Sequence, residues 1–265
     1  MPKLPLSCSL AGLAGLVLLL PATALPADPP LHVDPSVGDC EVRFAPELTQ
    51  DAFRRFVREF GSVSAFKQGA PPTTLGRLGI SLDVEQIFFS VDEHSAAWND
   101  TFTHPAADHV LGSDKAFPKL RLRVGVTDDL EVGAFFAKSP SANYGWLGLE
   151  TKYAVLRQGD DMPVALAVRG AYTKTLYVSD MDMHALTADV SIGRTFWKVL
   201  TPYVALGADA VLARETSPAV DLRTEHLVVP HAAGGLEVRF WHVAVGAEAQ
   251  LSAINTFQAQ VSAVF

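Results

Sequence analysis

The strongest constraint on this chain is the regular alternation of apolar and polar residues that runs from Leu75 to its end. In a β-strand, successive side chains point to opposite faces, so alternation gives each face its own solvent. The final stretch shows this most clearly, and its apolar face consists of Phe257, Ala259, Val261, Ala263 and Phe265. A terminal strand of this kind, ending on an aromatic residue, is typical of a transmembrane β-barrel whose apolar face meets lipid and whose polar face meets the lumen.

We count ten candidate strands, the first with the apolar set Leu78, Ile80, Leu82 and Val84 and the eighth with Leu236, Val238 and Phe240. Short connections between strands alternate with mostly longer ones. The short ones are at 127–129, 157–162, 197–200 and 240–242, and the others are at 90–116, 139–143, 176–183 and 214–225. The connection at 252–255 is an exception, because it is short but belongs to the second group. Short turns on one side and longer loops on the other are expected of bacterial barrels. The fold class predicted is all-β: a transmembrane antiparallel up-and-down β-barrel of about ten strands, with eight to twelve allowed, over residues 75–265.

The first 24 residues predict a secretory signal peptide. Lys3 supplies the positive start, an apolar core runs from Leu10 to Leu20, and Ala22-Thr-Ala24 is a cleavage site. Cys8 precedes the apolar core, which argues against a lipoprotein signal. Because Lys3 is the only charged residue removed, the net charge changes from −8 to −9. An acidic chain of this kind argues against nucleic acid as a partner.

Residues 25–74 predict a periplasmic N-terminal segment that precedes the barrel. Residues 25–46 are rich in proline and aspartate and predict an extended, poorly ordered lead, with Cys40 as a thiol in a flexible segment. A short amphipathic helix is expected over 49–60, with Thr49 as the N-cap and Gly61 just past its end. We expect this helix to cap the lower, periplasmic rim; sealing the barrel mouth or lying on the periplasmic leaflet are the alternatives.

Aromatic residues gather where two membrane interfaces are expected, because their rings hold an apolar body in lipid and a polar edge in water. The predicted periplasmic girdle contains Phe196, Trp197, Tyr203, Phe240, Trp241 and Phe265, and the outer girdle contains Phe88, Phe89, Tyr144 and Phe257.

Charged residues of both signs occupy the polar faces of the strands, interleaved with small residues. Small residues leave room for large charged ones in a narrow barrel, and opposite charges must pair where water is scarce. Ten strands are expected to leave at most a narrow passage, which predicts a salt-bridged plug. The predicted lumen charge network is Arg77, Asp83, Glu85, Lys119, Arg121, Arg123, Glu131, Glu150, Lys152, Arg169, Asp189, Asp209, Glu237, Arg239 and Glu248.

Two groups of residues carry side chains suited to metal binding or catalysis. The loop 92–114 carries His94, His104 and His109 among carboxylates, but their spacing is irregular for a metal site. Asp180, Asp182 and His184 share one loop and could lie at the outer rim near His94, as the acids and histidine of omptin-type barrel proteases do. Polar outer loops carry such residues routinely, and no hydrolase or phosphate-binding motif occurs. We therefore expect no catalytic site, no metal and no cofactor.

Several strand and turn sequences resemble a group of uncharacterised proteobacterial outer-membrane β-barrel proteins. They are Leu75-Gly-Arg-Leu-Gly-Ile-Ser-Leu-Asp-Val-Glu85, Phe117-Pro-Lys-Leu-Arg-Leu-Arg-Val-Gly-Val126, Asp129-Leu-Glu-Val-Gly-Ala134, Ala167-Val-Arg-Gly-Ala-Tyr172 and Thr201-Pro-Tyr-Val-Ala-Leu-Gly207. The resemblance implies a signal-directed barrel protein of the cell surface and brings no substrate or catalytic residue with it.

The sequence thus predicts a non-enzymatic protein of the bacterial outer membrane, either structural or a narrow conduit for small solutes. Its expected partners are outer-membrane lipid, the barrel-assembly machinery through the C-terminal strand ending at Phe265, and small solutes. Two alternatives remain open: an outer-rim barrel enzyme acting on peptide or lipid, and a soluble exported β-protein that binds a small apolar ligand.

Overall fold

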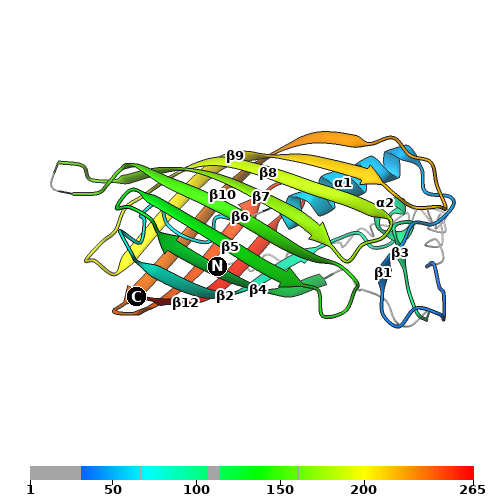
Figure 1. Cartoon of the computed structure of the whole chain (residues 1–265), viewed down its shortest axis with the longest axis horizontal. Helices are drawn as coiled ribbons and strands as arrows, with labels where there is room; N and C mark the ends of the chain where they lie inside the picture. Colours follow the sequence, from blue (N-terminus) through cyan, green and yellow to red (C-terminus); the bar gives the residue numbers. More distant parts are fainter. Residues whose placement is uncertain (1–30, 66, 107–113, 160) are drawn as a thin grey trace, which may run out of the picture.

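The computed structural model describes residues 31–65, 67–106, 114–159 and 161–265, so the predicted signal peptide lies outside the described residues. Its main feature is a closed antiparallel barrel in which each strand pairs with its neighbour in sequence and β12 pairs with β2 (Figure 1). The predicted up-and-down barrel of ten strands is confirmed. The strands are β2 (Ile80–Ser90), β4 (Asp114–Gly125), β5 (Leu130–Lys138), β6 (Gly145–Leu156), β7 (Ala165–Leu176), β8 (Met181–Gly193), β9 (Leu200–Glu215), β10 (Glu225–Phe240), β11 (Val243–Leu251) and β12 (Thr256–Val264).

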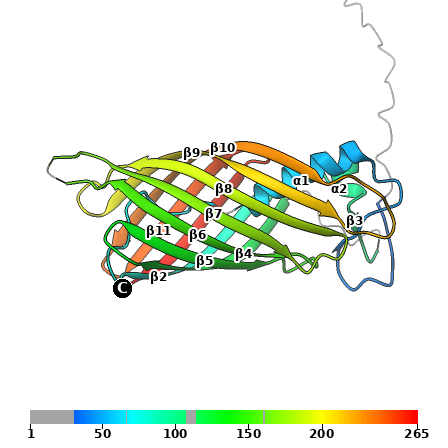
Figure 2. The ribbon, with the colours of Figure 1, turned by 45° about the horizontal axis from the view of Figure 1, so that its top comes forward.

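The two ends of the barrel differ. At one end, which we call the Phe265 end, Ile80 pairs with the terminal residue and short turns join β4 to β5 and β10 to β11. At the other, which we call the loop end, lie the longer connections after Ser90 and Glu215. Two helices, α1 (Gln50–Ser64) and α2 (Ala96–Asn99), and the two-stranded sheet of β1 (Glu41–Val42) and β3 (Phe102–Thr103) lie at the loop end in both Figure 1 and Figure 2.

The wall of the barrel is apolar outside and polar inside. Along β2, for example, Leu82 and Val84 are 50% and 56% exposed, whereas Asp83 and Glu85 between them are almost fully buried. A water-soluble barrel would place its polar side chains outward instead. The alternation expected from the sequence is therefore present with the apolar side on the outer surface. Among the described residues, no helix is long and apolar enough to span a membrane.

The first barrel strand starts later than expected. The sequence placed Leu78 on its lipid face and Arg77 in the lumen, but β2 begins at Ile80. Leu78 instead adopts a left-handed backbone conformation with φ of 64°, and its amide donates to the carbonyl of Gly125. Arg77 is exposed in this turn, so its predicted place in the lumen charge network is wrong.

The helix α1 lies at the opposite end of the barrel from the one expected. Thr49 caps it as predicted, because its side chain accepts a hydrogen bond from the amide of Ala52. Instead of resting on the rim beside Phe265, α1 sits at the loop end, where the side-chain amide of Gln50 donates to Glu225. Its apolar face, with Phe53, Phe56 and Phe60 fully buried, packs against the inner wall of the barrel mouth.

The helix also continues past Gly61, which was expected to end it, as far as Ser64. A Cβ atom on Gly61 would lie 2.8 Å from both methyl carbons of Val211 on β9. Glycine is therefore required here by the close approach of helix and wall, because a larger residue would collide with Val211.

The segment before α1 is packed against the loop end and does not form the poorly ordered lead expected for residues 25–46, of which 25–30 lie outside the described residues. Val42 and Phe44 are buried in the same apolar cluster as α1. Cys40 is 1% exposed, with its sulfur 3.0 Å from Nδ1 of His104, so the expectation of a thiol in a flexible segment is wrong.

Three predicted girdle residues point inward. Phe89 and Tyr144 join the buried aromatic cluster beneath α1, where the Tyr144 ring lies 5.3 Å from that of Phe60. Tyr203, expected in the periplasmic girdle, is buried in the lumen. The exposed aromatic residues Trp197, Phe240, Trp241 and Phe265 remain at the Phe265 end, and Phe88 and Phe257 remain outside near the loop end.

Candidate functional site

The middle of the barrel holds two chains of buried ion pairs, most of them between neighbouring strands and one, from Arg121 on β4 to Glu150 on β6, reaching across β5. Lys119 pairs with Glu85, and Arg121 bridges Glu85 and Glu150. Arg123 bridges two carboxylates in the same way, at 2.8 Å from Asp83 and 3.5 Å from Glu131. Arg169 lies 2.5 Å from Asp189 and 3.3 Å from Glu150. Lys152 completes the set with a contact of 3.2 Å to Glu131.

Cross-strand register explains why these partners meet. Glu85 lies opposite Lys119 on β2 and β4, Glu131 opposite Lys152 on β5 and β6, and Arg169 opposite Asp189 on β7 and β8. Asp83 and Arg123 meet diagonally, two residues apart in register. Each arginine side chain in the set is at most 2% exposed. Charges buried this deeply are tolerated only when they are paired and hydrogen-bonded, because the desolvation penalty is several kcal/mol per ion, as an order-of-magnitude figure.

The remaining predicted lumen residues are arranged differently. Asp209 accepts a hydrogen bond from Thr187 and lies 3.2 Å from Nδ1 of His231. Glu237 is buried and lies 3.4 Å from Arg239, which is partly exposed at the Phe265 end. Glu248 accepts a hydrogen bond of 2.8 Å from the Tyr203 hydroxyl.

The chain between α1 and β2 passes lengthwise through this charged interior. We call residues 67–79 the threaded segment. It enters below α1 at the loop end and reaches the Phe265 end, where the Gly76 carbonyl approaches Gly125 and the Leu78 amide donates to the Gly125 carbonyl. Arg77 is the one charged residue of the segment that the sequence assigned to the lumen, and its side chain is exposed outside the lumen.

Wall side chains bind the main chain of the threaded segment along its length. Arg169 donates to the carbonyl of Lys67 at 3.1 Å and Arg121 to that of Gln68 at 2.8 Å. Lys152 donates to the carbonyls of Pro71 and Thr73 at 3.2 and 3.0 Å. In the other direction, the amides of Gly69 and Leu75 donate to Glu248 and Glu131 at 2.9 and 3.1 Å. The ion pairs of the wall therefore also fix the threaded segment.

Gly69 shows how closely the segment is surrounded. Its φ is +57°, and a Cβ atom there would lie 2.4 Å from the side-chain nitrogen of Gln258 on β12. Both the left-handed backbone and the lack of space favour glycine at this position.

Sequence reasoning missed two buried groups of the lumen. Lys67 is 1% exposed, and its ammonium donates to the carbonyl of Ser62. His231, on a part of β10 that was not assigned to a strand, lies between Asp209 and Asp189, with Nε2 at 4.0 Å from the latter. Neither position carries an alternation signal, since Lys67 lies outside any strand and Pro230 precedes His231.

The acids and histidine weighed for catalysis do not form one site. The Asp180 carboxylate accepts hydrogen bonds from the Phe44 amide and the Ser179 hydroxyl, so it holds the N-terminal segment in place. His184 lies on the outer face of β8, with Nε2 at 3.3 Å from Asp182 and Nδ1 at 2.5 Å from the Tyr172 hydroxyl. His94 pairs weakly with Glu93 at 4.0 Å. Within the described residues no group of three or more histidine, cysteine, aspartate or glutamate side chains could hold a metal, and His109 lies outside them.

Comparison with known proteins identifies no family for this chain. No protein-family model matches the sequence, and no curated protein sequence matches it. Similar solved structures include Ail, the attachment invasion locus protein of Yersinia pestis, in complex with the heparin analogue sucrose octasulfate. Its sequence is 14% identical to this chain. The alignment covers 71% of this chain and 99% of Ail, with a TM-score of 0.34.

Two others are a KdgM porin, with 9% identity, 70% and 99% coverage and a TM-score of 0.37, and an outer-membrane channel from Pseudomonas putida F1, with 9% identity, 76% and 100% coverage and a TM-score of 0.47.

Proposed function

We propose that this protein is a non-enzymatic barrel of the bacterial outer membrane whose lumen is closed in the state described. It is either structural or a narrow conduit for small solutes, and a solute passes only when the threaded segment is displaced. The observation that carries this proposal is the row of hydrogen bonds from Arg121, Arg169 and Lys152 to the main chain of that segment.

The distribution of polarity supports a membrane location. The outer wall exposes large apolar residues such as Leu206 and Val245, while charged residues fill the interior. A soluble carrier of an apolar ligand needs the reverse arrangement, with an apolar cavity inside. Outer-membrane lipid is therefore the proposed surrounding, and the C-terminal strand ending at Phe265 is the proposed contact for the assembly machinery. Membership of the proteobacterial group stays a prediction from sequence.

Conductance in planar lipid bilayers tests the closed lumen. The mature chain is compared with a variant lacking residues 49–74, which removes α1 and most of the threaded segment, and with a control lacking only residues 25–38. We expect rare or no openings for the mature chain and the control, and steady conductance for the 49–74 deletion. Large, steady conductance of the mature chain would contradict the proposal. So would a folded 49–74 deletion, verified by heat-modifiable gel mobility, that stays closed.

One observation favours a second candidate, an enzyme at the outer rim. Asp182, His184 and the Tyr172 hydroxyl form a row, with Asp182 3.3 Å from Nε2 of His184 and the hydroxyl 2.5 Å from Nδ1. In the tautomer whose Nε2 carries the proton, the carboxylate orients the imidazole and Nδ1 accepts from the hydroxyl. This is the arrangement of an activated oxygen nucleophile. Incubating the purified protein with surface peptides and lipids, beside Tyr172→Phe and His184→Ala variants, tests it; turnover that both substitutions abolish would establish the enzyme.

A further inference from the structure

The barrel wall is low beside α1, because neighbouring strands end at different heights. β9 and β10 each have 16 residues, whereas β11 and β12 have 9 and are joined by the short turn at 252–255. Pairing of β10 with β11 begins at Ala232, so the stretch from Glu225 to His231 extends beyond the end of β11. We call the gap between the 252–255 turn and the loop end of the barrel the side window.

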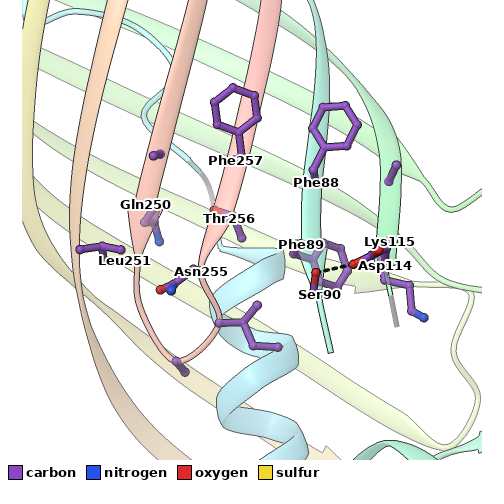
Figure 3. A pocket seen from close by; sticks show the side chains of 14 residues that line it. Phe88, Phe89, Ser90, Asp114, Lys115, Gln250, Leu251, Asn255, Thr256 and Phe257 are labelled. Atoms are coloured by element: carbon purple, nitrogen blue, oxygen red, sulfur yellow. Dashed lines mark hydrogen bonds between the residues drawn. The ribbon is translucent and has the colours of Figure 1, made fainter. Parts of the chain in front are cut away.

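The helix α1 lies directly behind this turn (Figure 3). The amide of Ile254, in the turn, donates to the Ser62 hydroxyl at 3.3 Å. The next turns of α1 toward its start rise above the wall and present Arg54, Arg55 and Arg58 to the side window, where all three are exposed. The apolar face of the same helix is turned toward the barrel interior.

A groove of about 660 Å³ lies between these arginines and the upper part of β10. Its other side is apolar and includes Leu227, Ala253 and Val228, and the side chain of Val228 points outward and is 73% exposed. The groove thus combines guanidinium groups with an apolar surface that is continuous with the outer face of the barrel.

A second pocket, of about 840 Å³, lies on the other flank of the turn, and Ala253 lines both. Phe88 and Phe257 stand side by side on its outward wall, with ring centroids 6.2 Å apart (Figure 3). Ser90 and Asp114 are hydrogen-bonded to each other at 2.5 Å on the edge of the pocket nearest the loop end. An acyl chain that lies along the outer face of the barrel would meet these two rings below the arginines.

The acidic residues near the groove already have partners of their own. Glu225 accepts from Gln50 and Arg54, and Glu59 accepts from Arg55 and from the Trp98 ring nitrogen. The side chains of Arg54 and Arg55 nevertheless remain 62% and 50% exposed. A guanidinium has five N–H donors in a planar fork, so donors remain for an anion, and phosphate matches this fork well. Asp51, which is exposed, and Glu59 also line the groove, and Asp92 lies 3.8 Å from Arg55. With Glu225, four carboxylates therefore balance the three arginines, and the site offers directed guanidinium donors and no net positive charge.

We infer that the side window binds a phosphorylated lipid from the surrounding membrane, with the phosphate on Arg54, Arg55 and Arg58 and the acyl chains on Val228, Phe88 and Phe257. An anion that also carries acyl chains fits both parts of the site. The arginines lie nearer the loop end than Phe88 and Phe257, which belong to the apolar outer wall of the barrel. The inference does not depend on whether the lumen conducts.

Binding of lipid to the full mature chain in nonionic detergent micelles tests this inference, and isothermal titration calorimetry is the readout. The probes are a diphosphorylated glycolipid, the same glycolipid after enzymatic removal of its phosphates, and inorganic phosphate. The test variant is the triple substitution Arg54→Gln, Arg55→Gln and Arg58→Gln. The matched control, Arg77→Gln, Arg157→Gln and Lys198→Gln, removes the same charge from exposed positions at the Phe265 end.

We expect the diphosphorylated lipid to bind the unaltered chain and the control equally, and the test variant at least about tenfold more weakly, because charge-assisted hydrogen bonds are lost. Phe88→Ala with Phe257→Ala is expected to weaken the lipid and leave inorganic phosphate unchanged. Equal binding by the folded test variant, or equal binding of the dephosphorylated lipid, would overturn the inference. Inorganic phosphate binding as tightly as the lipid would overturn it too, in favour of a site for free anions.

Discussion

The carboxylate of Glu131 accepts the main-chain amide of Leu75 at 3.1 Å, while its other oxygen lies 3.2 Å from the ammonium of Lys152. One buried side chain of the wall therefore holds the threaded segment and an ion pair at once. Because Lys152 in turn donates to the carbonyls of Pro71 and Thr73, the segment and the wall charges form a single hydrogen-bonded unit. Removing one member leaves its buried neighbours with fewer hydrogen bonds and less opposing charge.

Arg169→Ala is expected to destabilise the protein by about 3–5 kcal/mol, because it leaves Asp189 and Glu150 buried without their shared cation. Unfolding by urea in lipid vesicles measures the change. Arg157→Ala is the control, since its pair with Asp129 is exposed and surface pairs contribute about 0–1 kcal/mol. Equal effects of the two substitutions would show that the buried ion pairs are not important for stability.

Gly61→Ala is expected to cost about 1–3 kcal/mol through overpacking, because the added methyl group meets the side chain of Val211. The double variant with Val211→Ala should recover part of this loss, since the smaller side chain vacates the space. The same unfolding assay decides the matter. Failure of Val211→Ala to rescue would indicate that α1 does not pack on β9 in the membrane-bound protein.

The position of α1 implies that the N-terminal segment lies at the cell surface if the Phe265 end faces the periplasm. In a Cys40→Ser background, we expect Glu47→Cys to react with a membrane-impermeant maleimide on intact cells. Trp241→Cys, at an exposed site of the Phe265 end, should react only after the cells are opened. The reverse pattern of labelling would mean that the barrel has the opposite orientation.

Burial raises the pKa of the Cys40 thiol to about 11, from an ordinary value of 9.0. The folded chain should therefore resist alkylation by iodoacetamide at pH 9, whereas the unfolded chain reacts. Because the folded pKa is the higher, the contribution of the thiol to stability is complete below pH 9 and is lost as the pH rises toward 11. The unaltered chain should lose more stability than Cys40→Ser between pH 8 and pH 10.5. An equal loss would argue against a buried thiol.

Alternation sufficed to predict the wall of the barrel, because a strand between lipid and lumen needs opposite polarity on successive residues. Positions such as Asp83, Arg121 and Arg169 could be assigned to the interior on this basis alone. The same rule erred at Arg77, since alternation continues into the turn before β2, and it was silent on Lys67, which lies in no strand.

The end of the barrel at which α1 lies could not be predicted, because the amphipathic pattern of a helix shows that one face is buried and not which partner covers it. Tyr203, Phe89 and Tyr144 were misplaced for a related reason. An aromatic residue suits a membrane interface and a packed barrel mouth equally well. The alternation along β2 and β9 assigns Phe89 and Tyr203 to the lumen face, and this signal was passed over, whereas Tyr144 precedes β6.

The seam between β12 and β2 joins the last strand of the chain to the first, and the threaded segment immediately precedes β2. Once these two strands have paired, residues 67–79 are encircled and cannot enter sideways. We therefore expect residues 67–79 to be in place while the sheet is still open, before β12 and β2 pair. Folding of this protein would then require the barrel strands to assemble around residues 67–79. Pairing of β12 with β2 would be the last step, and it would enclose the segment.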